Sequence, residues 1–282
     1  MTISGYPGHM HKTRKALRAA MADTDVVIEM LDARAPGASI NPLLAALRGP
    51  LPCLAILNKC DLADPDVTGR WQDYLNSRPG TLALTNERDH PLNKRQLTAA
   101  CKQLTGNRHS PARMQQVLIT GIPNVGKSTL LNQLLNRKLA KTGNEPAITR
   151  HLQRARLDDG WVLVDTPGML WPKLEDQDAA FRLAALGTIR NTAIDMADVG
   201  WLLRDFYPRL AERYALRDRP ADAEALLTCI ARAQGCLSRG GSVDWYRVSE
   251  LLLDDLRSGR LGRISLEQPP ETSEVDSGSP AP

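Results

Sequence analysis

The sequence contains no long apolar run and no apolar leader. A membrane-spanning helix needs about 18 or more consecutive apolar residues, and no stretch of the chain approaches that length. The first residues, MTISGYPGHMHKTRK, lack the apolar core and cleavage site of a secretory signal. The five cysteines are scattered and form no C-x-x-C pair, which argues against a disulfide framework and against a zinc site. We therefore expect a protein of a reducing compartment.

Charge is distributed unevenly along the 282 residues, although the net charge is only +4 at pH 7. Basic residues gather before the first acid, Asp23, and again between positions 137 and 156, where Glu145 is the single acid. Such clusters are typical of nucleic-acid binding, because each neutralised phosphate releases counterions. They are equally typical of a solvated helix face, so charge alone leaves both interpretations open.

The apolar pattern predicts an α/β fold. Short apolar strands are expected at residues 24–34, 51–59, 81–85, 115–121 and 161–165. Helical patterns are found at residues 9–22, 66–77, 91–104 and 130–136. Pro36, Gly37 and Asn41-Pro42 indicate a loop after the first strand, and residues 105–114 read as a linker. Strands that alternate with helices predict a mainly parallel sheet covered on both faces.

The pattern changes near residue 175, after which only helical periodicity remains. We expect an α/β domain over residues 1–174 and a small all-helical C-terminal domain over residues 175–267. One expected helix stops at Gly235, which fits a C-terminal cap, and another ends near Gly259. Residues 268–282 are rich in proline, serine and acidic residues and are expected to be a disordered acidic tail.

The sequence GIPNVGKST, residues 121–129, fits the phosphate-binding pattern G-x-x-x-x-G-K-[ST]. An apolar strand precedes it and a helix follows, which is the context that this motif requires. Gly121 and Gly126 let backbone N–H groups surround the phosphates. In that arrangement Lys127 reaches the β- and γ-phosphates, and Ser128 ligates Mg²⁺.

The sequence DTPG, residues 165–168, ends another apolar strand. Taken alone it would be an ordinary turn. Because it follows the phosphate-binding loop and its helix, Asp165 fits the carboxylate that organises Mg²⁺. The N–H of Gly168 can then meet the γ-phosphate.

The sequence NKCD, residues 58–61, follows the apolar strand LPCLAIL. Asp61 can accept hydrogen bonds from the N1–H and the 2-amino group of guanine. Adenine has neither donor, so its binding would leave the carboxylate unpaired. Asn58 braces the loop, and the aliphatic stem of Lys59 can lie over the base. Together with the other two loops, NKCD predicts GTP rather than ATP.

The order of these three loops is unusual. In an ordinary GTPase the phosphate-binding loop comes first and the base-reading loop last. Here NKCD comes first, GIPNVGKST second and DTPG third. A chain can be cut and rejoined at new ends without moving such a site, so the sequence predicts a circularly permuted P-loop GTPase domain.

The sequence also offers candidates for a second switch residue and for the groups that would activate water. Thr149 is the candidate for a second Mg²⁺-ligating switch residue. Met169 and Leu170 stand where many GTPases place a glutamine that orients the attacking water, and neither side chain can do this. Asn124 could instead help to hold a monovalent cation beside the phosphates, and His9 could reach the site from the N-terminal segment.

The whole chain resembles the ribosome biogenesis GTPase A family of circularly permuted GTPases. The resemblance rests on residues YPGHM (6–10), DAR (32–34), NKCD (58–61), GIPNVGKST (121–129), AKTG (140–143), DTPGMLWPK (165–173), ERYAL (212–216), GCL (235–237) and GRISLEQP (262–269). Ala147 departs from the family, which usually has glycine in the switch.

The resemblance implies GTP contacts from Asn58, Lys59, Cys60, Asp61, Asn86, Glu87, Asn124, Val125, Gly126, Lys127, Ser128, Thr129 and Gly168. The loop with Asn86 and Glu87 would offer backbone groups to the guanine. Catalytic roles are expected for His9, Asn124 and Lys127, with Mg²⁺ held by Ser128, Thr149 and Asp165. The resemblance also implies potassium dependence and activation by the ribosomal particle.

These observations predict a cytoplasmic GTPase that binds the precursor of the large ribosomal subunit and its rRNA, with no membrane or DNA partner. It would hydrolyse GTP to promote a late step of assembly. One alternative is an rRNA-binding scaffold that needs GTP but turns it over negligibly. Another is a small-molecule kinase, against which NKCD and the permuted loop order count.

Overall fold

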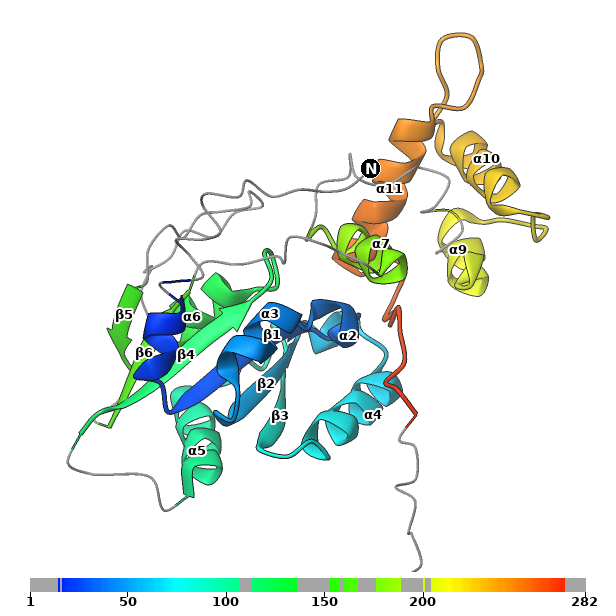
Figure 1. Ribbon diagram of the computed structural model, residues 1–282. Helices are drawn as coiled ribbons and strands as arrows, with labels where there is room; N and C mark the ends of the chain where they lie inside the picture. The colour runs from blue at the N-terminus through cyan, green and yellow to red at the C-terminus, as the bar shows by residue number, and fades with distance from the viewer. Residues whose placement is uncertain are drawn as a thin grey trace, which may run out of the picture.

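A computed structural model shows an α/β part joined to a helical part (Figure 1). The structure describes residues 15, 17–106, 113–135, 153–157, 160–166, 176–188, 200 and 204–271.

A mixed sheet forms the centre of the α/β part (Figure 1). Its described strands are β1 (Val26–Asp32), β2 (Cys53–Asn58), β3 (Thr81–Asn86), β4 (Gln115–Gly121), β5 (Gln153–Arg156) and β6 (Trp161–Asp165). Their order in the sheet is β3-β2-β1-β4-β6-β5. All neighbouring strands are parallel except β5 and β6, which are antiparallel. The prediction of a mainly parallel sheet is therefore confirmed.

The carboxyl ends of β1, β2 and β3 are level with one another. Asp32 is paired with Asn58, and Asn58 with Asn86, in the register of the strands. The chain leaves β4 and β6 at this same edge, because those strands run parallel to β1. Ligands of open α/β sheets bind outside the carboxyl ends of the strands, so the register places polar side chains where a ligand site is expected.

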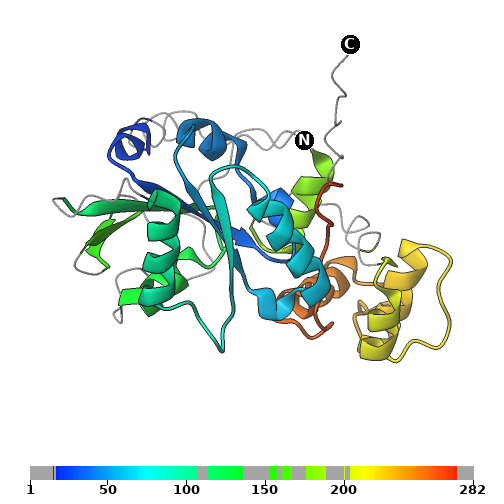
Figure 2. The same cartoon turned by 90° about the horizontal axis from the view of Figure 1, so that it is seen from below.

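Helices cover both faces of the sheet (Figure 2). Those of the α/β part are residues 17–22, α2 (Pro36–Ser39), α3 (Pro42–Arg48), α4 (Pro65–Asn76), α5 (Lys94–Thr105) and α6 (Lys127–Leu135). Ile28 and Ile56 share one apolar cluster with α5 and α6. Leu31 and Leu57, which point the other way, pack with α4. Because both faces are covered, the strands are nearly continuous apolar runs.

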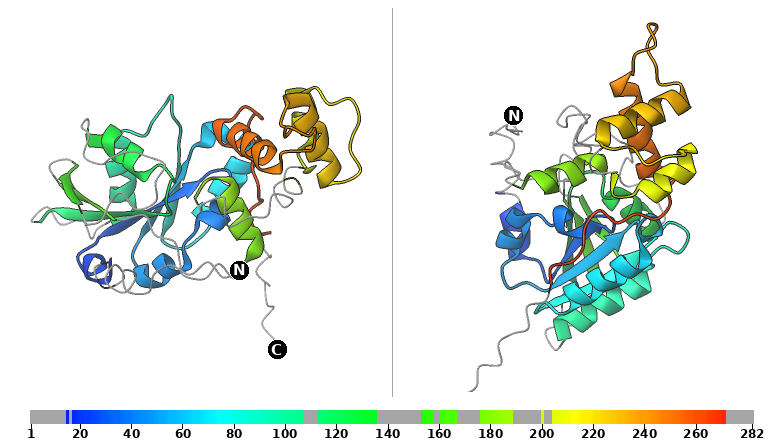
Figure 3. Two further views of the ribbon diagram at one scale, coloured as in Figure 1. Left: turned by 90° about the horizontal axis from the view of Figure 1, so that it is seen from above. Right: turned by 90° about the vertical axis from the view of Figure 1, so that its right-hand side faces the viewer.

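The described helices of the C-terminal part are α7 (Gln177–Ala185), α9 (Tyr207–Tyr214), α10 (Ala223–Gln234) and α11 (Trp245–Ser258). Gly235 and Gly259 cap α10 and α11 with φ of 67° and 80°, which confirms the expected cap at Gly235 and the expected helix end near Gly259. Helices α9 and α10 lie farther from the sheet than α7 and α11 do (Figures 1 and 3). Among the described residues, no helix is long and apolar enough to cross a bilayer.

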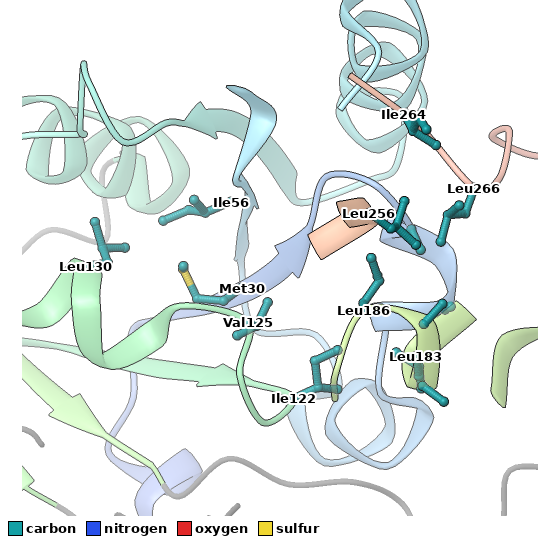
Figure 4. Close-up of a cluster of buried hydrophobic side chains, with 14 of the residues drawn as sticks. Met30, Ile56, Ile122, Val125, Leu130, Leu183, Leu186, Leu256, Ile264 and Leu266 are labelled. Carbon is teal, nitrogen blue, oxygen red and sulfur yellow. The ribbon is translucent and has the colours of Figure 1, made fainter. Parts of the chain in front are cut away.

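The apolar core continues from the sheet into the helical part (Figure 4). Met30 and Val125 of the α/β part belong to the same cluster as Leu183 of α7 and Leu256 of α11. Leu266 returns to this cluster from beyond α11. The boundary predicted at residue 175 falls outside the described residues, and the helices after it share a core with the sheet.

Three local expectations differ from the structure. The segment expected to be a loop after the first strand forms α2 and α3, because Pro36 and Pro42 occupy first-turn positions and Asn41 caps α3. Strand β5 is absent from the expected elements, since its sequence QRAR lacks apolar alternation. Helix α6 begins at Lys127, earlier than the residue 130 expected.

Candidate nucleotide site

The phosphate-binding loop connects β4 to α6 at the carboxyl edge of the sheet. Gly126 lies in this loop with φ of 99°, and a Cβ built on it would lie 2.2 Å from Nδ2 of Asn58. A side chain at position 126 would therefore displace the NKCD loop, which follows β2. Val125 is buried, whereas Thr129 at the start of α6 is exposed.

Asn58 joins the NKCD loop to the phosphate-binding loop. Its Nδ2 donates to the carbonyl of Val125 at 2.7 Å, and its Oδ1 accepts from Asn86 Nδ2 at 2.6 Å. Asn86 is itself held by the N–H of Leu92. The sequence placed Asn86 in a loop beside the guanine, but it is the buried last residue of β3, and its side chain supports Asn58.

Lys59 makes a second link between the same two loops. Its Nζ donates to the carbonyl of Asn124 and to Oδ2 of Asp32, each at 2.9 Å. Burial would raise the pKa of Asp32, but Arg34 and Lys59 outweigh burial and hold that pKa well below its usual range. Asp32 therefore stays ionised and fixes the Lys59 ammonium against the phosphate-binding loop.

Asp32 and Arg34 were not among the predicted site residues. Both are almost fully buried, and Arg34 contacts the Asp32 carboxylate through Nε and Nη2, each at 2.9 Å. The available signal was an acidic residue at the end of a mostly apolar strand, paired in register with Asn58 of NKCD. Buried charges are rare unless they are paired, so this position called for a partner.

Cys60 and Asp61 form a short 3₁₀ turn, Cys60–Leu62, directly after Lys59. Burial and the charges of Glu87 and Asp61 raise the pKa of the Cys60 thiol, so it remains protonated at neutral pH. The Asp61 side chain is half-buried, and its carboxylate accepts no hydrogen bond from the described residues. It is available to accept hydrogen bonds from a base.

Lys127 and Asp165 meet at the junction of the phosphate-binding loop and β6. Lys127 Nζ lies 2.5 Å from Asp165 Oδ1 and also donates to the Thr166 carbonyl, and both charged side chains are buried. Burial raises the pKa of Asp165, and Lys127 only partly offsets this. The motifs GIPNVGKST and DTPG are thus in direct contact.

The site has features that fit a Mg²⁺ ion. Asp165 Oδ2 is buried and has no hydrogen-bond partner among the described residues. Ser128 is half-buried in the first turn of α6. One carboxylate and one hydroxyl, completed by water and phosphate oxygens, are a usual ligand set for Mg²⁺ in nucleotide sites. The donor chemistry present therefore matches this metal.

The Asn124 side chain contacts the helical part, while its main-chain carbonyl accepts from Lys59 of the NKCD loop. It has a left-handed backbone, with φ of 60°, and its Nδ2 donates to the Gly187 carbonyl at 2.8 Å. Three other predicted residues, His9, Thr149 and Gly168, lie outside the described residues. Their roles stay predictions, as do the nucleotide contacts of the residues described above.

The sequence is similar to those of known GTPases. A family model described as "50S ribosome-binding GTPase" matches residues 116–223, from β4 to the start of α10. Ribosome biogenesis GTPase A of Bacillus cereus is 39% identical, with 97% of this chain and 96% of that protein covered. The protein of the same name from Priestia megaterium is 37% identical, with coverage of 97% and 99%.

Solved structures show the same likeness. The structure titled "Crystal structure of GNP-bound YlqF from T. maritima" is similar with a TM-score of 0.65 and 25% identity, covering 91% of this chain and 98% of that one. A GDP-bound structure of the same protein gives a TM-score of 0.64 at 26% identity, with 90% and 98% covered. With the permuted order of NKCD, GIPNVGKST and DTPG around one sheet edge, these matches show that the chain belongs to the ribosome biogenesis GTPase A family and is a GTP hydrolase.

Proposed function

We propose that the chain binds the precursor of the large ribosomal subunit and hydrolyses GTP to promote a late step of its assembly. The observation that carries this proposal is the junction of two loops, made by Asn58 on the Val125 carbonyl and by Lys59 on the Asn124 carbonyl. This junction supports one guanine nucleotide that spans both loops. The names of the bacterial relatives support a ribosomal subunit as partner.

Each end of the nucleotide has its own candidate residues. Asp61 would accept hydrogen bonds from the guanine, and the Lys59 stem would lie over the base. At the other end Lys127 would leave Asp165 for the β- and γ-phosphates, while N–H groups of residues 124–129 would surround them. A γ-phosphate would thus compete directly with the contact between Lys127 and Asp165.

Mg²⁺ is the cofactor that we propose for the phosphate end. Ser128 and Asp165 would hold it, with Thr149 as the switch ligand. When bound, the ion would neutralise charge that develops on the phosphate oxygens during transfer. The unpartnered Asp165 Oδ2 supports this role because a buried carboxylate oxygen needs a donor or a metal.

Potassium is a further proposed cofactor, held beside the phosphates by Asn124. The Nδ2 atom of this side chain is engaged by Gly187, so Oδ1 is the atom that would ligate the ion. Met169 and Leu170 come directly after DTPG, so no glutamine stands there to orient the attacking water. We therefore propose slow hydrolysis by the protein alone, with water positioned by His9 when the particle is bound.

The helical part supplies a surface suited to rRNA. Trp245 and Tyr246, at the start of α11, are large aromatic residues whose side chains are exposed, at 38% and 65%. The exposed Arg239 lies in the turn before them, and Asp244 is the single acid between Glu224 and Glu250. Exposed aromatic rings stack on unpaired bases, and arginines pair with phosphates. Unpaired bases are abundant in folded RNA, so we propose rRNA rather than DNA or a membrane.

We assign the remaining features on the same basis. Residues 175–267 would form the unit that faces the ribosome, and residues 268–282 a disordered acidic tail.

We propose the cytoplasm as the compartment. Large ribosomal subunits are assembled in the bacterial cytoplasm, and the relatives at 37% and 39% identity are bacterial. All five cysteines are free thiols, which suits the same reducing compartment.

Sedimentation with purified large ribosomal subunits tests the partner. The chain should pellet with the subunits in the presence of a non-hydrolysable GTP analogue and should be released by GDP. The variant Tyr246→Ala should weaken this association, whereas Arg95→Ala, an exposed change on α5, should not. Association that is independent of the nucleotide would contradict the proposal, and so would equal binding by both variants.

A further inference from the structure

The motif GRISLEQP, noted at residues 262–269, lies beyond α11 and returns to the nucleotide edge of the sheet. We call residues 262–267 the C-terminal strap. It runs beside residues 60–64, the segment that begins within NKCD. Four hydrogen bonds join the two segments: Arg263 Nη2 to Cys60 O at 2.8 Å, Arg263 Nε to Ala63 O at 2.9 Å, Ile264 N to Leu62 O at 3.0 Å, and Asp64 N to Ser265 Oγ at 3.1 Å.

The strap is fixed to the rest of the protein on both sides of these contacts. Ile264 and Leu266 are buried in the shared apolar core, where Figure 4 shows them near Leu256. Glu267 accepts from the N–H of Ala38 at 3.0 Å, and its carbonyl accepts from Trp71 Nε1 at 3.4 Å. Arg263 therefore projects from an anchored backbone.

The end of α11 packs against the same turn. Gly259 caps this helix, and a Cβ built on Gly259 would lie 2.7 Å from Cδ2 of Leu62. Leu62 follows Asp61 directly in the chain. The turn that carries Asp61 is thus bounded by α11 on one side and by the strap on another.

We infer that Arg263 is a positioning residue for guanine recognition, acting through the backbone on either side of Asp61. Its guanidinium joins the carbonyls of Cys60 and Ala63, which bracket Asp61 and Leu62. A 3₁₀ turn of three residues has weak hydrogen bonds of its own, so its geometry depends on outside partners. The inference rests on the proposed role of Asp61 as the reader of guanine.

The two hydrogen bonds from Arg263 to the carbonyls of Cys60 and Ala63 also connect the helical part to the segment proposed to read the base. The strap follows α11 without a break, so a displacement of α11 would pull on Arg263 and hence on Asp61. A partner that moves α11 would thereby change affinity for the guanine end of the nucleotide.

The test compares two nucleotides that differ only where Asp61 reads the base. Inosine diphosphate lacks the 2-amino group of GDP, so the ratio of their dissociation constants reports how well Asp61 is placed. Titration calorimetry on the full chain with Mg²⁺ would measure both constants. For Arg263→Met we expect about tenfold weaker GDP binding and about twofold weaker binding of inosine diphosphate, as loss of one charge-assisted hydrogen bond would give.

A matched control separates positioning from stability. Arg260 lies three residues earlier and pairs with Asp255, not with the NKCD turn. Arg260→Met should lower the melting temperature and leave the ratio of dissociation constants unchanged. Arg263→Lys should restore part of the ratio, because one ammonium can reach one of the two carbonyls. Ser265→Ala is the milder variant if Arg263→Met does not fold.

A double variant completes the test. In the background of Asp61→Asn, Arg263→Met should no longer change the ratio, because the reader is already lost. If the unaltered chain prefers guanine and Arg263→Met leaves the ratio of the two dissociation constants unchanged, this inference is wrong. The proposed role of Asp61 would then still stand. Absence of guanine preference in the unaltered chain would instead overturn the proposed role of Asp61.

Discussion

The side-chain amide of Asn124, in the phosphate-binding loop, donates a 2.8 Å hydrogen bond to the carbonyl of Gly187, just beyond α7. Gly187 has φ of 80°, and the end of α7 is capped by Arg257 of α11, which donates to the carbonyls of Ala184 and Ala185. The helical part therefore contacts the phosphate end of the nucleotide site directly.

Asn124→Ala should abolish the difference between potassium and sodium in GTP turnover. The substitution removes Oδ1, the proposed ligand of the monovalent cation, and also releases Gly187. GDP affinity should change by no more than about threefold, because Lys59 holds the Asn124 main-chain carbonyl, which alanine retains. Steady-state phosphate release in the two salts measures this. If potassium still stimulates GTP turnover in this variant, Asn124 does not bind the cation.

Asp61→Asn should change the preferred base from guanine to xanthine and leave the fold intact. Asparagine can accept from N1–H and donate to the 2-carbonyl of xanthine, whereas it faces the 2-amino group of guanine with a donor. We expect GTP affinity to fall about 100-fold and XTP affinity to rise. Competition binding with the two nucleotides checks this. GTP affinity equal to that of the unaltered chain would exclude Asp61 as the guanine reader.

Lys127→Ala should reduce single-turnover GTP hydrolysis by at least about 100-fold and weaken nucleotide binding. It removes the cation proposed for the β- and γ-phosphates. It also leaves Asp165 buried without its partner, so the pKa of that carboxyl should rise further above its usual range. Rapid-quench hydrolysis with saturating GTP measures the loss. Normal hydrolysis would contradict the assignment of the phosphate-binding loop.

Asp255→Asn should destabilise the helical part at neutral pH. The Asp255 carboxylate is fully buried and accepts hydrogen bonds from Arg213 Nε and Tyr214 OH, each at 2.8 Å, and from Arg260 Nε. Burial raises its pKa, but these three donors outweigh burial and lower the pKa below the ordinary 3.8. We expect a loss of about 2 kcal/mol in the free energy of unfolding at pH 7.

The pH dependence of that loss follows from the direction of the shift. Because the folded-state pKa is lowered, the stabilisation by Asp255 is fully present above pH 3.8 and is lost as pH falls through the folded-state value. Urea unfolding of the parent and the Asn variant from pH 7 to pH 3 should give free energies of unfolding whose difference shrinks as the pH falls below 3.8. A difference that is constant over this range would show that the carboxylate charge does not matter.

Much of the nucleotide edge was predictable because its residues lie in short, local patterns. Strands β1, β2, β4 and β6 follow from apolar runs, and the three motifs follow from fixed spacings that bind phosphate or a base. Helix α6 begins at Lys127 because the phosphate-binding loop ends there, a start that apolar periodicity alone placed too late.

The supports of the site were not predictable in the same way. Asn86 was expected in the loop after the strand, with backbone groups toward the guanine, but it ends β3, and its side-chain amide holds Asn58 from the neighbouring strand. Arg263 meets Cys60 across a separation of 203 residues, and Asn124 meets Gly187 across 63. Such contacts depend on how the helical part packs on the sheet, and nothing in the local sequence around either residue encodes it.

We expect the large ribosomal particle to activate GTP hydrolysis by this protein. The most direct test is the GTP turnover rate in potassium buffer, with and without purified large ribosomal subunits. We predict slow turnover by the protein alone and strong stimulation by the subunits, with the stimulation lost in His9→Ala. Tight GTP binding without any stimulation would contradict the account and favour an rRNA-binding scaffold that uses GTP without turning it over.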